Sequence, residues 1–590
     1  MNKIKITDYR KDIDGLRAIA VMAVILFHLG FLPNGYLGVD VFFAISGYLI
    51  TKIAYNDVLG NRFSILGFYL RRIRRIIPLV LFTSLTALII GLFVMLPDDF
   101  ENLCQSVFAT NVFANNILLL ITSGNYWAIA NEYKPLMHTW SLGIEEQFYL
   151  IFPLLFILLD KKRSRLILPV LFILALISLL LFVFSTNPAD KFYSIQFRFF
   201  ELSFGGIGYI ICKDRLINAR YKVLMTLFLL FILLFDFHLI AEIKLLLVVL
   251  FSIGLLISDN KNKIGSLFLE NKIMVGIGKI SFSLYMWHQI VLAYMRYCFV
   301  DKPGVIESIY FFVIIFLLSI FSYFIIEQPF RDKNRINTKF LLQISGFVFL
   351  FTCIVSYYLY SIGGIVRNVP ELEINKSDKK LNHGSGKRNI HIEYNAKIYD
   401  LDKKFTTNDK MKVLVIGNSF ARDFANILLE SQSGNQIEIS YVYDINACAD
   451  INDRLGKAKY IFFSELSIDV FHDLEKKYNI DSEKAWNVGT KNFGSNNGIF
   501  YNKKRDANYC FQRTFMTRYI LERNNTLKKQ WGKKYIDLIG AIIDKENRVP
   551  VFTSDCTFIS QDCSHLTHAG AVYFAKILHI SLNENNGIYN

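Results

Sequence analysis

The feature that most constrains this chain is a series of long apolar stretches in its first 360 residues. A helix needs about 20 apolar residues to cross a bilayer. About eleven stretches approach that length, near 16–32, 36–52, 78–96, 138–159, 166–184, 197–212, 223–236, 239–257, 273–299, 305–326 and 340–360. Hydrophobic residues make up 53% of the chain, above the usual share for a soluble protein. We therefore predict a polytopic α-helical membrane domain of about 11 spans.

Basic residues between these stretches indicate the orientation. The positive-inside rule places short loops rich in lysine and arginine in the cytoplasm. With the N-terminus inside, every basic connection falls on the same side: 62–75, 160–165, 213–222, 261–263 and 331–339. The acidic loop 97–134 falls outside, and an odd number of spans exports everything after Tyr360. Topology alone can explain the net charge of +15, so we predict no nucleic-acid partner.

A change in composition after Tyr360 indicates a second domain. Residues 361–410 are polar and basic, which is typical of a linker or a loosely packed extension. From Met411 the pattern of buried strands and helices predicts an α/β domain. We expect a membrane domain over 1–337, a linking transmembrane helix over 338–360, the linker, and an exported domain over 411–590.

Four cysteines lie in the expected exported domain: Cys448, Cys510, Cys556 and Cys563. In an oxidising compartment they suggest two disulfides with three possible pairings. We favour Cys556 with Cys563, which would clamp the loop before His565. No CxxC pair accompanies these cysteines, so we predict no metal site.

Three polar residues mark the first two apolar stretches. Arg17 begins the first, His28 lies well inside it, and Asp40 opens the second. Charged or imidazole groups at membrane depth usually face a polar cavity and mark a functional path. His28 is therefore either a general base or proton relay, or a structural histidine with its hydrogen bonds satisfied.

Further polar groups lie at the ends of later apolar stretches. Arg71, Arg72, Arg74 and Arg75 lie before the third stretch and can anchor topology or bind phosphates. In HTWSLGIEEQFY, Glu145 and Glu146 point about 100° apart on a helix, so only one is expected to share a face with His138. Glu201 is another intramembrane carboxylate. Ser281, Tyr285 and His288 share a helix face.

The exported domain carries the residue types of a serine hydrolase. In VLVIGNSFARDF, Ser419 follows a strand and opens a helix, where free amides can stabilise an oxyanion. A serine there is more often only a helix cap. The signal sharpens at QDCSHLTHAGA, because Asp562 and His565 lie three residues apart and complete the order Ser, Asp, His.

The membrane part resembles the membrane-bound acyltransferase family 3. The resemblance covers residues 9–331 and rests on RKDIDGLRAIAVMAVILFH, GYLGVDVFFAISGYLIT, FYLRRIRRIIP, HTWSLGIEEQFYL, RFFELSFGGIGY, KISFSLYMWHQ and IEQPFR. It implies transfer of an acyl group, usually acetyl, from a cytoplasmic donor such as acetyl-CoA to a glycan on the far side. It also implies that Arg17, His28, Asp40 and the four arginines belong to the active path. Glu146, Glu201 and Tyr285 match motif positions whose roles are less defined.

Residues 411–582 resemble the SGNH (GDSL-like) esterase family. Ser419 matches its nucleophile, and Asp562 with His565 match its closing block. The segment Gly489-Thr490-Lys491-Asn492 resembles the oxyanion block, with Asn492 as the side-chain donor and Gly489 as a backbone candidate. The first block departs from the family pattern, since it reads GNSF and not GDS.

The fusion of these two families implies O-acetylation of bacterial surface polysaccharides, such as lipopolysaccharide O-antigen, or of peptidoglycan. We therefore expect a multi-pass O-acetyltransferase of the bacterial inner membrane, with a cytoplasmic N-terminus and a periplasmic C-terminal domain. Its expected partners are acetyl-CoA, a surface glycan that can be lipid-linked, and membrane lipids. The alternatives are a membrane-tethered glycan O-acetyl esterase and a transporter with a binding module.

Overall fold

The computed structural model divides the chain into two compact units. The first, the membrane unit, comprises Met1–Phe93, Asn102–Arg296 and Lys302–Tyr357. The second, the C-terminal unit, comprises Val94–Glu101, Tyr297–Asp301 and Tyr358–Asn590. The residues that the structure describes are 9–123, 131–158, 165–213, 218, 220–259, 268–299, 303–378, 390–494, 496–503, 506–560, 562–582 and 588–589.

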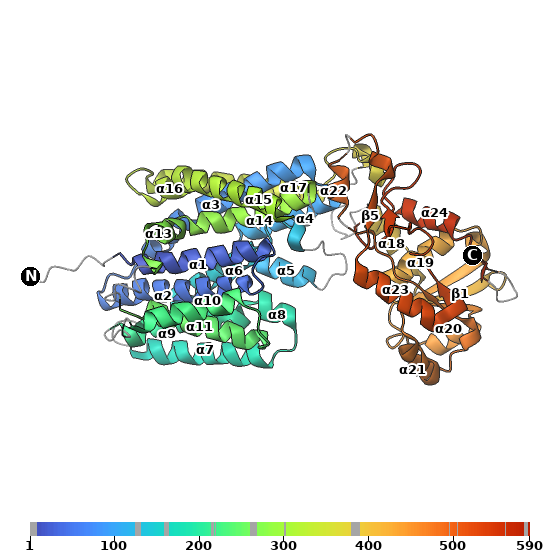
Figure 1. Ribbon diagram of the computed structural model, residues 1–590, viewed down its shortest axis with the longest axis horizontal. Helices are drawn as coiled ribbons and strands as arrows, with labels where there is room; N and C mark the ends of the chain where they lie inside the picture. The colour runs from blue at the N-terminus through green and yellow to red at the C-terminus, as the bar shows by residue number, and fades with distance from the viewer. Residues whose placement is uncertain are drawn as a thin grey trace, which may run out of the picture. The chain divides into compact units, whose positions relative to one another are not determined.

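The membrane unit is built from long helices that run alongside one another (Figure 1). Each predicted apolar stretch contains a helix, and the stretch 273–299 is divided into two at Ile280. These helices are α1 (Lys11–His28), α2 (Gly38–Leu59), α3 (Ile65–Val94), α6 (Thr139–Leu158), α7 (Ile167–Phe184), α9 (Ile195–Cys212), α10 (Arg220–Leu234), α11 (Ala241–Leu256), α13 (Lys272–Lys279), α14 (Ser281–Cys298), α15 (Val305–Ser322) and α17 (Thr338–Ser361).

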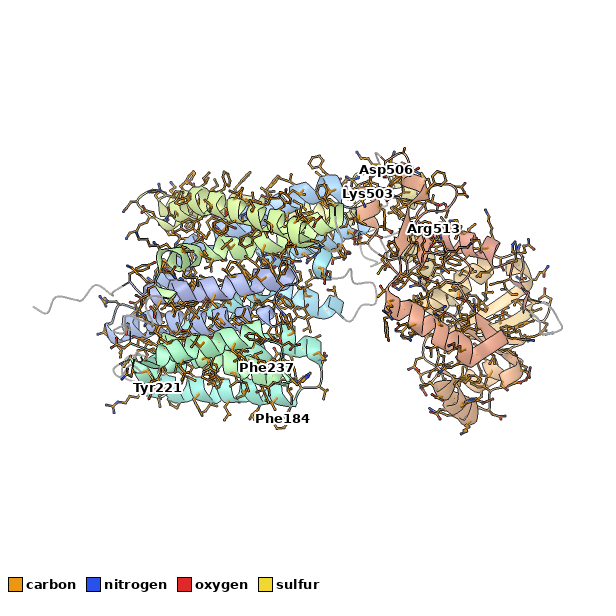
Figure 2. All side chains as sticks on the ribbon, viewed as in Figure 1. Phe184, Tyr221, Phe237, Lys503, Asp506 and Arg513 are labelled. Atoms are coloured by element: carbon orange, nitrogen blue, oxygen red, sulfur yellow. A yellow bond between two sulfur atoms is a disulfide. The ribbon has the colours of Figure 1, made fainter. Side chains whose placement is uncertain are left out.

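Among the described residues, five helical segments are long and apolar enough to cross a membrane: Gly35–Leu59, Ile65–Val94, Ile167–Phe184, Val305–Arg331 and Thr338–Ser361. Helix α7 exposes several large apolar side chains, among them Phe184 at its last residue. Near the start of α10, Tyr221 is exposed as well (Figure 2). An apolar surface of this extent suits contact with lipid and not with water. The unit is therefore a largely membrane-like helical domain.

Shorter helices interrupt the connections. Within the loop expected outside the membrane, α4 (Pro97–Asn111) and α5 (Asn115–Ser123) are helical, which the sequence analysis did not predict. Other short segments are α8 (Pro188–Tyr193), a π-helical turn at Tyr323–Glu327 and α16 (Gln328–Arg331). Parts of the basic connections that were used to predict the orientation, at 160–164, 214–217 and 261–263, lie outside the described residues.

Glycines bring α2 and α9 into close contact. A Cβ placed on Gly47 would lie 1.8 Å from the carbonyl oxygen of Leu202, and one on Gly205 would lie 2.2 Å from that of Ala44. Small residues at a helix crossing let two backbones approach within a membrane. Because Ser46 directly precedes Gly47, this crossing also sets the position of Ser46.

The C-terminal unit contains a five-stranded parallel sheet. Its strands are β1 (Met411–Ile416), β2 (Ile437–Val442), β3 (Tyr460–Ser464), β4 (Ala485–Val488) and β6 (Tyr535–Ile536), in the spatial order β2-β1-β3-β4-β6. Register pairs Val413 with Ile439 and with Tyr460. The order reverses direction after β2, which makes the carboxyl end of β1 a favoured place for a site in an open parallel sheet.

Helices cover both faces of this sheet (Figure 1). On one face, α19 (Ser419–Glu430) and α24 (His568–Ile577) pack on Val413 and Val415. On the other, α20 (Ile451–Lys457), α21 (Ile468–Tyr478) and α23 (Arg518–Trp531) pack on Leu414 and Ile416. Alternate side chains of β1 therefore enter opposite cores, as a doubly covered strand requires. The remaining elements are α18 (Ile390–Ala396), α22 (Asn497–Tyr501), β5 (Arg513–Phe515), β7 (Arg548–Pro550), β8 (Ser581–Leu582) and β9 (Ile588–Tyr589).

The segment predicted as a linker is in part folded onto the C-terminal unit. Val369, Leu372 and Ile374 are buried in a core shared with Phe552 and Phe558. Residues 379–389 of the predicted linker lie outside the described part of the chain. The overall polar composition of 361–410 therefore did not indicate the few apolar residues that pack this segment onto the C-terminal unit.

The predicted pairing of Cys556 with Cys563 is wrong. The structure joins Cys510 to Cys556. Both cysteines pack against one small apolar core, because the chain from α22 to β5 folds beside the loop after β7. Cys448 and Cys563 are not in a disulfide. The pairing depends on this tertiary proximity, which sequence spacing does not contain.

Candidate functional site

A polar cavity lies among the helices of the membrane unit. Its polar lining comes from five helices: Arg17 from α1, Ser46 from α2, Arg75 from α3, Ser141 and Glu145 from α6, and Ser281 and Tyr285 from α14. The remaining lining residues, Val39, Phe42, Phe43, Ile45, Leu142 and Phe282, are apolar. Two predicted site residues, Arg17 in the first apolar stretch and Arg75 just before the third, therefore share one cavity with Tyr285.

Hydrogen bonds fix the acidic side of this cavity. Ser46 Oγ donates to Glu145 Oε1 at 3.0 Å, and the Tyr149 hydroxyl donates to Glu145 Oε2 at 3.2 Å. Arg17 Nη1 lies 3.1 Å from Asp14 Oδ1. Arg17 also lines a more open cleft with Lys279 and Arg331. The lining of the cavity thus includes one carboxylate and two guanidinium groups.

Three histidines form a cluster together with Tyr285. The ring centroids of His28 and His288 are 5.3 Å apart, and those of His138 and His288 are 5.1 Å apart. Tyr285 lies 5.3 Å from each of His138 and His288, and its hydroxyl donates to the carbonyl of His138 at 2.8 Å. His138 and His288 were noted in the sequence, but their proximity to His28 depends on the packing of α1, α6 and α14.

The four predicted phosphate-binding arginines differ in their surroundings. Arg71 is exposed and lies 3.3 Å from Asp57 Oδ2, and Arg72 lies 4.7 Å over the ring of Tyr149. Arg74 is buried and donates to the carbonyls of Phe330 and Ile336 at 3.0 and 2.8 Å. All four line a cleft together with Arg331. Arg74 therefore tethers a neighbouring segment, whereas Arg75 reaches both the cleft and the cavity.

Asp40 and Glu201 lie together in a separate buried cluster. Arg198 Nη1 lies 2.9 Å from Asp40 Oδ1 and 2.9 Å from Glu201 Oε1. Neither carboxylate is among the residues that line the cavity, so the structure does not bring them to Arg17 and Tyr285. Glu146 is likewise absent from that lining, and its neighbour Glu145 takes the place. The helical phase separates these two glutamates as the 100° step requires.

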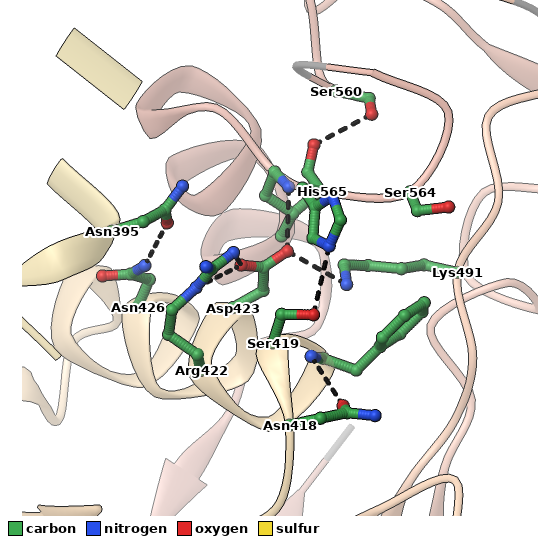
Figure 3. A network of polar contacts seen from close by, with 12 residues as sticks. Asn395, Asn418, Ser419, Arg422, Asp423, Asn426, Lys491, Ser560, Ser564 and His565 are labelled. Atoms are coloured by element: carbon green, nitrogen blue, oxygen red, sulfur yellow. Dashed lines mark hydrogen bonds and ion pairs between the residues drawn. The ribbon is translucent and has the colours of Figure 1, made fainter. Parts of the chain in front are cut away.

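In the C-terminal unit, three predicted residues form a serine–histidine–aspartate triad, and Figure 3 shows its contact between Ser419 and His565. Ser419 Oγ lies 3.1 Å from His565 Nε2, and His565 Nδ1 lies 2.7 Å from Asp562 Oδ2. The other oxygen of Asp562 accepts the backbone N–H groups of Ser564 and His565, at 2.6 and 2.8 Å. This geometry allows His565 to take the serine proton while Asp562 holds the imidazole.

Local structure explains why the triad forms. Ser419 opens α19, where Asn418 caps the helix by accepting from the N–H of Phe420 at 3.0 Å. Gly417 has a φ of 135°, which a residue with a side chain rarely adopts, and it turns β1 sharply into the helix. Burial opposes ionisation of Asp562, but hydrogen bonds and the neighbouring His565 hold its pKa below the ordinary value. The carboxylate therefore stays ionised beside the imidazole.

The predicted oxyanion residues, Gly489 and Asn492, both lie after β4. The N–H of Gly489 donates to the carbonyl of Ile536 at 2.8 Å, as part of the sheet edge. The side-chain oxygen of Asn492 accepts the N–H of Gly494 at 3.0 Å. Both residues thus carry structural hydrogen bonds at the edge of the site.

A buried charged cluster beside Ser419 was missed by the sequence analysis. Arg422 Nη2 lies 2.6 Å from Asp423 Oδ1, and Lys491 Nζ lies 3.0 Å from Asp423 Oδ2. All three side chains are at most 1% exposed. Charged residues this deeply buried are rare unless paired. Their letters, in SFARDF and GTKNFG, give no sign of burial, because the helix and the loop meet only in the fold. No group of three or more His, Cys, Asp or Glu side chains that could hold a metal is found among the described residues.

Comparison with known proteins places this chemistry in a family. The family described as acyltransferase domain, acyltransferase family 3, matches residues 10–328. A protein of Staphylococcus aureus (strain MRSA252) named "Putative O-acetyltransferase SAR0937" is 28% identical over 501 residues, covering 74% of this chain and 80% of that protein. The O-acetyltransferase OatA of Staphylococcus aureus (strain NCTC 8325 / PS 47) is 31% identical over 374 residues, covering 57% of this chain and 60% of that protein.

No solved structure matches the chain. The family match covers more than half of the sequence and includes the helices that form the polar cavity and the histidine cluster. The chain therefore belongs to acyltransferase family 3 and is an acyltransferase.

Proposed function

We propose that this chain is a multi-pass membrane O-acetyltransferase that moves acetyl from cytoplasmic acetyl-CoA to a hydroxyl of a surface polysaccharide. One observation carries the proposal: a single polypeptide combines a polar cavity in the acyltransferase region with a serine triad in a separate unit. The names of the relatives, O-acetyltransferase, support the type of transfer. Lipopolysaccharide O-antigen and peptidoglycan are the two acceptor classes to test.

The arginine-lined clefts provide the donor side of this scheme. Acetyl-CoA carries phosphates, for which the guanidinium fork of arginine is well shaped. Arg71, Arg72 and Arg75 line one cleft, and Arg75 continues into the cavity. The acetyl group would enter beside Arg17 and reach Tyr285. His28, with the two histidines behind Tyr285, would then accept a proton or relay the acyl group. Asp40 and Glu201 would hold α2 against α9 through Arg198 and act on the path indirectly.

The C-terminal unit provides the acceptor side as an SGNH-type domain. Ser419 Oγ attacks the acyl carbonyl, its proton passes to His565 Nε2, and the acyl–donor bond breaks as the leaving group takes that proton. In the second step His565 removes the proton of a sugar hydroxyl, the sugar oxygen attacks the acyl-serine, and Ser419 regains its proton. Each step exchanges one acyl–oxygen or acyl–donor bond for another, so the cycle requires no reactant besides the acyl donor and the sugar.

The scheme requires a defined topology. It places the N-terminus in the cytoplasm, about 11 spans in the bacterial inner membrane, and residues 411–590 outside. A reporter enzyme that is active only outside the cytoplasm should be active when it is fused to the C-terminal end. A cytosolic reporter signal would contradict the scheme, because donor and triad would then share one side.

The proposal is tested by mass spectrometry of surface glycans from cells with and without the chain. We expect acetylated glycan only with the intact chain, and its loss in His28→Ala and in Ser419→Ala. Matched controls are His472→Ala on α21 and Ser482→Ala, which are both exposed. Full acetylation in Ser419→Ala would remove the triad from the pathway. Unchanged glycans in cells lacking the whole chain would overturn the proposed acceptor.

A further inference from the structure

Lys491 is the most deeply buried lysine near the serine triad. It follows β4 in the loop of the predicted oxyanion block, and its side chain is 1% exposed. Its ammonium forms an ion pair with Asp423 Oδ2 at 3.0 Å and lies 3.7 Å from the ring centroid of Phe420. An ammonium has three donors, and the contact with Asp423 can use one of them.

The contacts of Lys491 place its nitrogen beside the reacting groups. Phe420 directly follows Ser419, and its ring lies 6.2 Å from that of His565. Asp423 Oδ2, the oxygen next to the ammonium, also accepts the N–H of Leu566 at 2.9 Å, one residue after His565. The ammonium is therefore enclosed by the immediate neighbours of both triad residues. Figure 3 shows the Lys491 side chain in the same polar network as Ser419 and His565, where it is joined to Asp423.

The pairing with Asp423 does not by itself explain why a lysine is buried here. Arg422 already forms two contacts with Asp423 Oδ1, at 2.6 and 3.1 Å. Asp423 thus faces two cations, with Glu465 as a weaker electrostatic partner of Lys491. A second buried cation is costly unless enough negative charge offsets it. The oxyanion of an acyl-transfer intermediate is such a charge, and it forms only during the reaction.

Of the two oxyanion residues expected from the sequence, Gly489 uses its N–H within the sheet, whereas Asn492 uses its side-chain oxygen and not its amide donor in its contact. The N–H of Gly489 bonds to Ile536, and the side-chain oxygen of Asn492 bonds to Gly494. Lys491, between them, extends into the cluster instead. The same loop therefore also brings an ammonium to Asp423 and Phe420, beside the triad serine in the chain.

We propose that Lys491 is a catalytic residue whose ammonium stabilises the oxyanion formed when Ser419 attacks an acyl group. The inference rests on the proposed role of Ser419 as nucleophile. As the Ser419 Oγ–carbon bond forms, the carbonyl electron pair moves onto oxygen and the serine proton moves to His565. The ammonium of Lys491 faces the new negative charge until the carbonyl re-forms and the leaving group departs.

The charged groups around Lys491 predict a pH signature. They are Asp423 and Arg422 on α19, Glu465 after β3, and His565 with Asp562 before α24. Burial lowers the pKa of Lys491, and Asp423 opposes this effect only in part. We expect the acylation rate to fall at alkaline pH as the ammonium loses its proton. The midpoint of this fall should lie below the ordinary pKa of a lysine.

The test uses the full-length protein in detergent and a fluorophosphonate probe, whose phosphorus is attacked by Ser419 with loss of fluoride. Mass spectrometry of the Ser419 peptide measures the rate of adduct formation from pH 6 to pH 11, a range set by the ordinary lysine pKa of about 10.4. We expect Lys491→Met to slow the reaction about 100-fold or more. Lys476→Met on α21, at an exposed lysine, is the matched control, and its rate should stay within about threefold of wild type, far from the loss for an oxyanion donor.

Lys491→Arg separates a catalytic role from a structural one. Arginine remains protonated, so a variant that reacts should lose the alkaline fall seen in wild type. A reaction rate in Lys491→Met equal to that of wild type would overturn the proposal. If Lys491→Met does not fold, an alkaline fall shared by wild type and Lys491→Arg would overturn it instead. Absence of any Ser419 adduct in wild type would overturn the proposed nucleophile together with this inference.

Discussion

Replacing Gly47 by alanine tests whether the close crossing of α2 and α9 sets the geometry of the membrane cavity. The added Cβ would lie 1.8 Å from the carbonyl oxygen of Leu202, which is backbone and cannot rotate away. The helices must separate by roughly 2 Å to restore ordinary van der Waals contact, a change that costs about 1–3 kcal/mol as overpacking. Ser46, the neighbour of Gly47, lines the cavity and bonds to Glu145. A displacement of this size can reduce catalysis by as much as about 100-fold.

The assay pairs thermal unfolding in detergent with the amount of acetylated surface glycan at matched expression. The matched control is Gly346→Ala in α17, where an added Cβ meets nothing within 4 Å. Alanine favours a helix over glycine by about 1 kcal/mol, so the control should be as stable as wild type or more so, with normal acetylation. Equal unfolding temperature and full activity in Gly47→Ala would refute the reasoning.

Three further predictions concern the C-terminal unit. Asp562→Asn should slow acylation of Ser419 by about 10⁴-fold, because the amide cannot hold the imidazole in the same state; a smaller than tenfold loss in the fluorophosphonate assay would exclude the triad. Asp423→Asn should destabilise the unit by about 3–5 kcal/mol at neutral pH, whereas Asp453→Asn, in an exposed pair, should cost at most about 1 kcal/mol. Burial opposes ionisation of Asp423, but Lys491 and Arg422 hold its pKa below the ordinary value. Its contribution is therefore full above about pH 4 and is lost as the pH falls through its folded pKa; urea unfolding across that range should show no such loss in the variant. Cys510→Ser should remove about 4 kcal/mol by releasing a cross-link that spans 46 residues, and equal unfolding with and without reductant in wild type would contradict this.

Local patterns in the sequence predicted most of the elements. The apolar stretches predicted helices because a buried or lipid-facing helix needs little more than length and composition. The break between α13 and α14 and the helices α4 and α5 were not predicted. The break follows Gly276 and Gly278, and Gly278 contacts the backbone of Asp14 so closely that a Cβ would lie 1.9 Å from its oxygen. Such a constraint comes from a partner helix and not from the local sequence.

The candidate sites divide in the same way. The serine triad was predictable because its motifs are local in sequence. A serine directly after a strand, and a histidine three residues after an aspartate, can be recognised from neighbouring residues alone. The choice of Glu145 over Glu146 depended on helix rotation by 100°, and the meeting of His28 with His288 depended on packing. Lys491 and Asp423 could not be recognised, because a lysine and an aspartate are ordinary surface residues until the fold buries them.

Water access decides whether a serine triad adds or removes an acyl group. A transferase and an esterase share the acyl-serine, and they differ in whether a sugar hydroxyl or water resolves it. Ser419 is 3% exposed and His565 is 1% exposed, so an acyl-serine here would have little contact with bulk water. Excluding water suppresses hydrolysis of a reactive intermediate. The buried triad therefore favours transfer over hydrolysis, provided that an acceptor can displace the side chains around it. Acetyl-Ser419 should then persist when no glycan is added and disappear when the acceptor is supplied, and rapid release of acetate without acceptor would indicate an esterase.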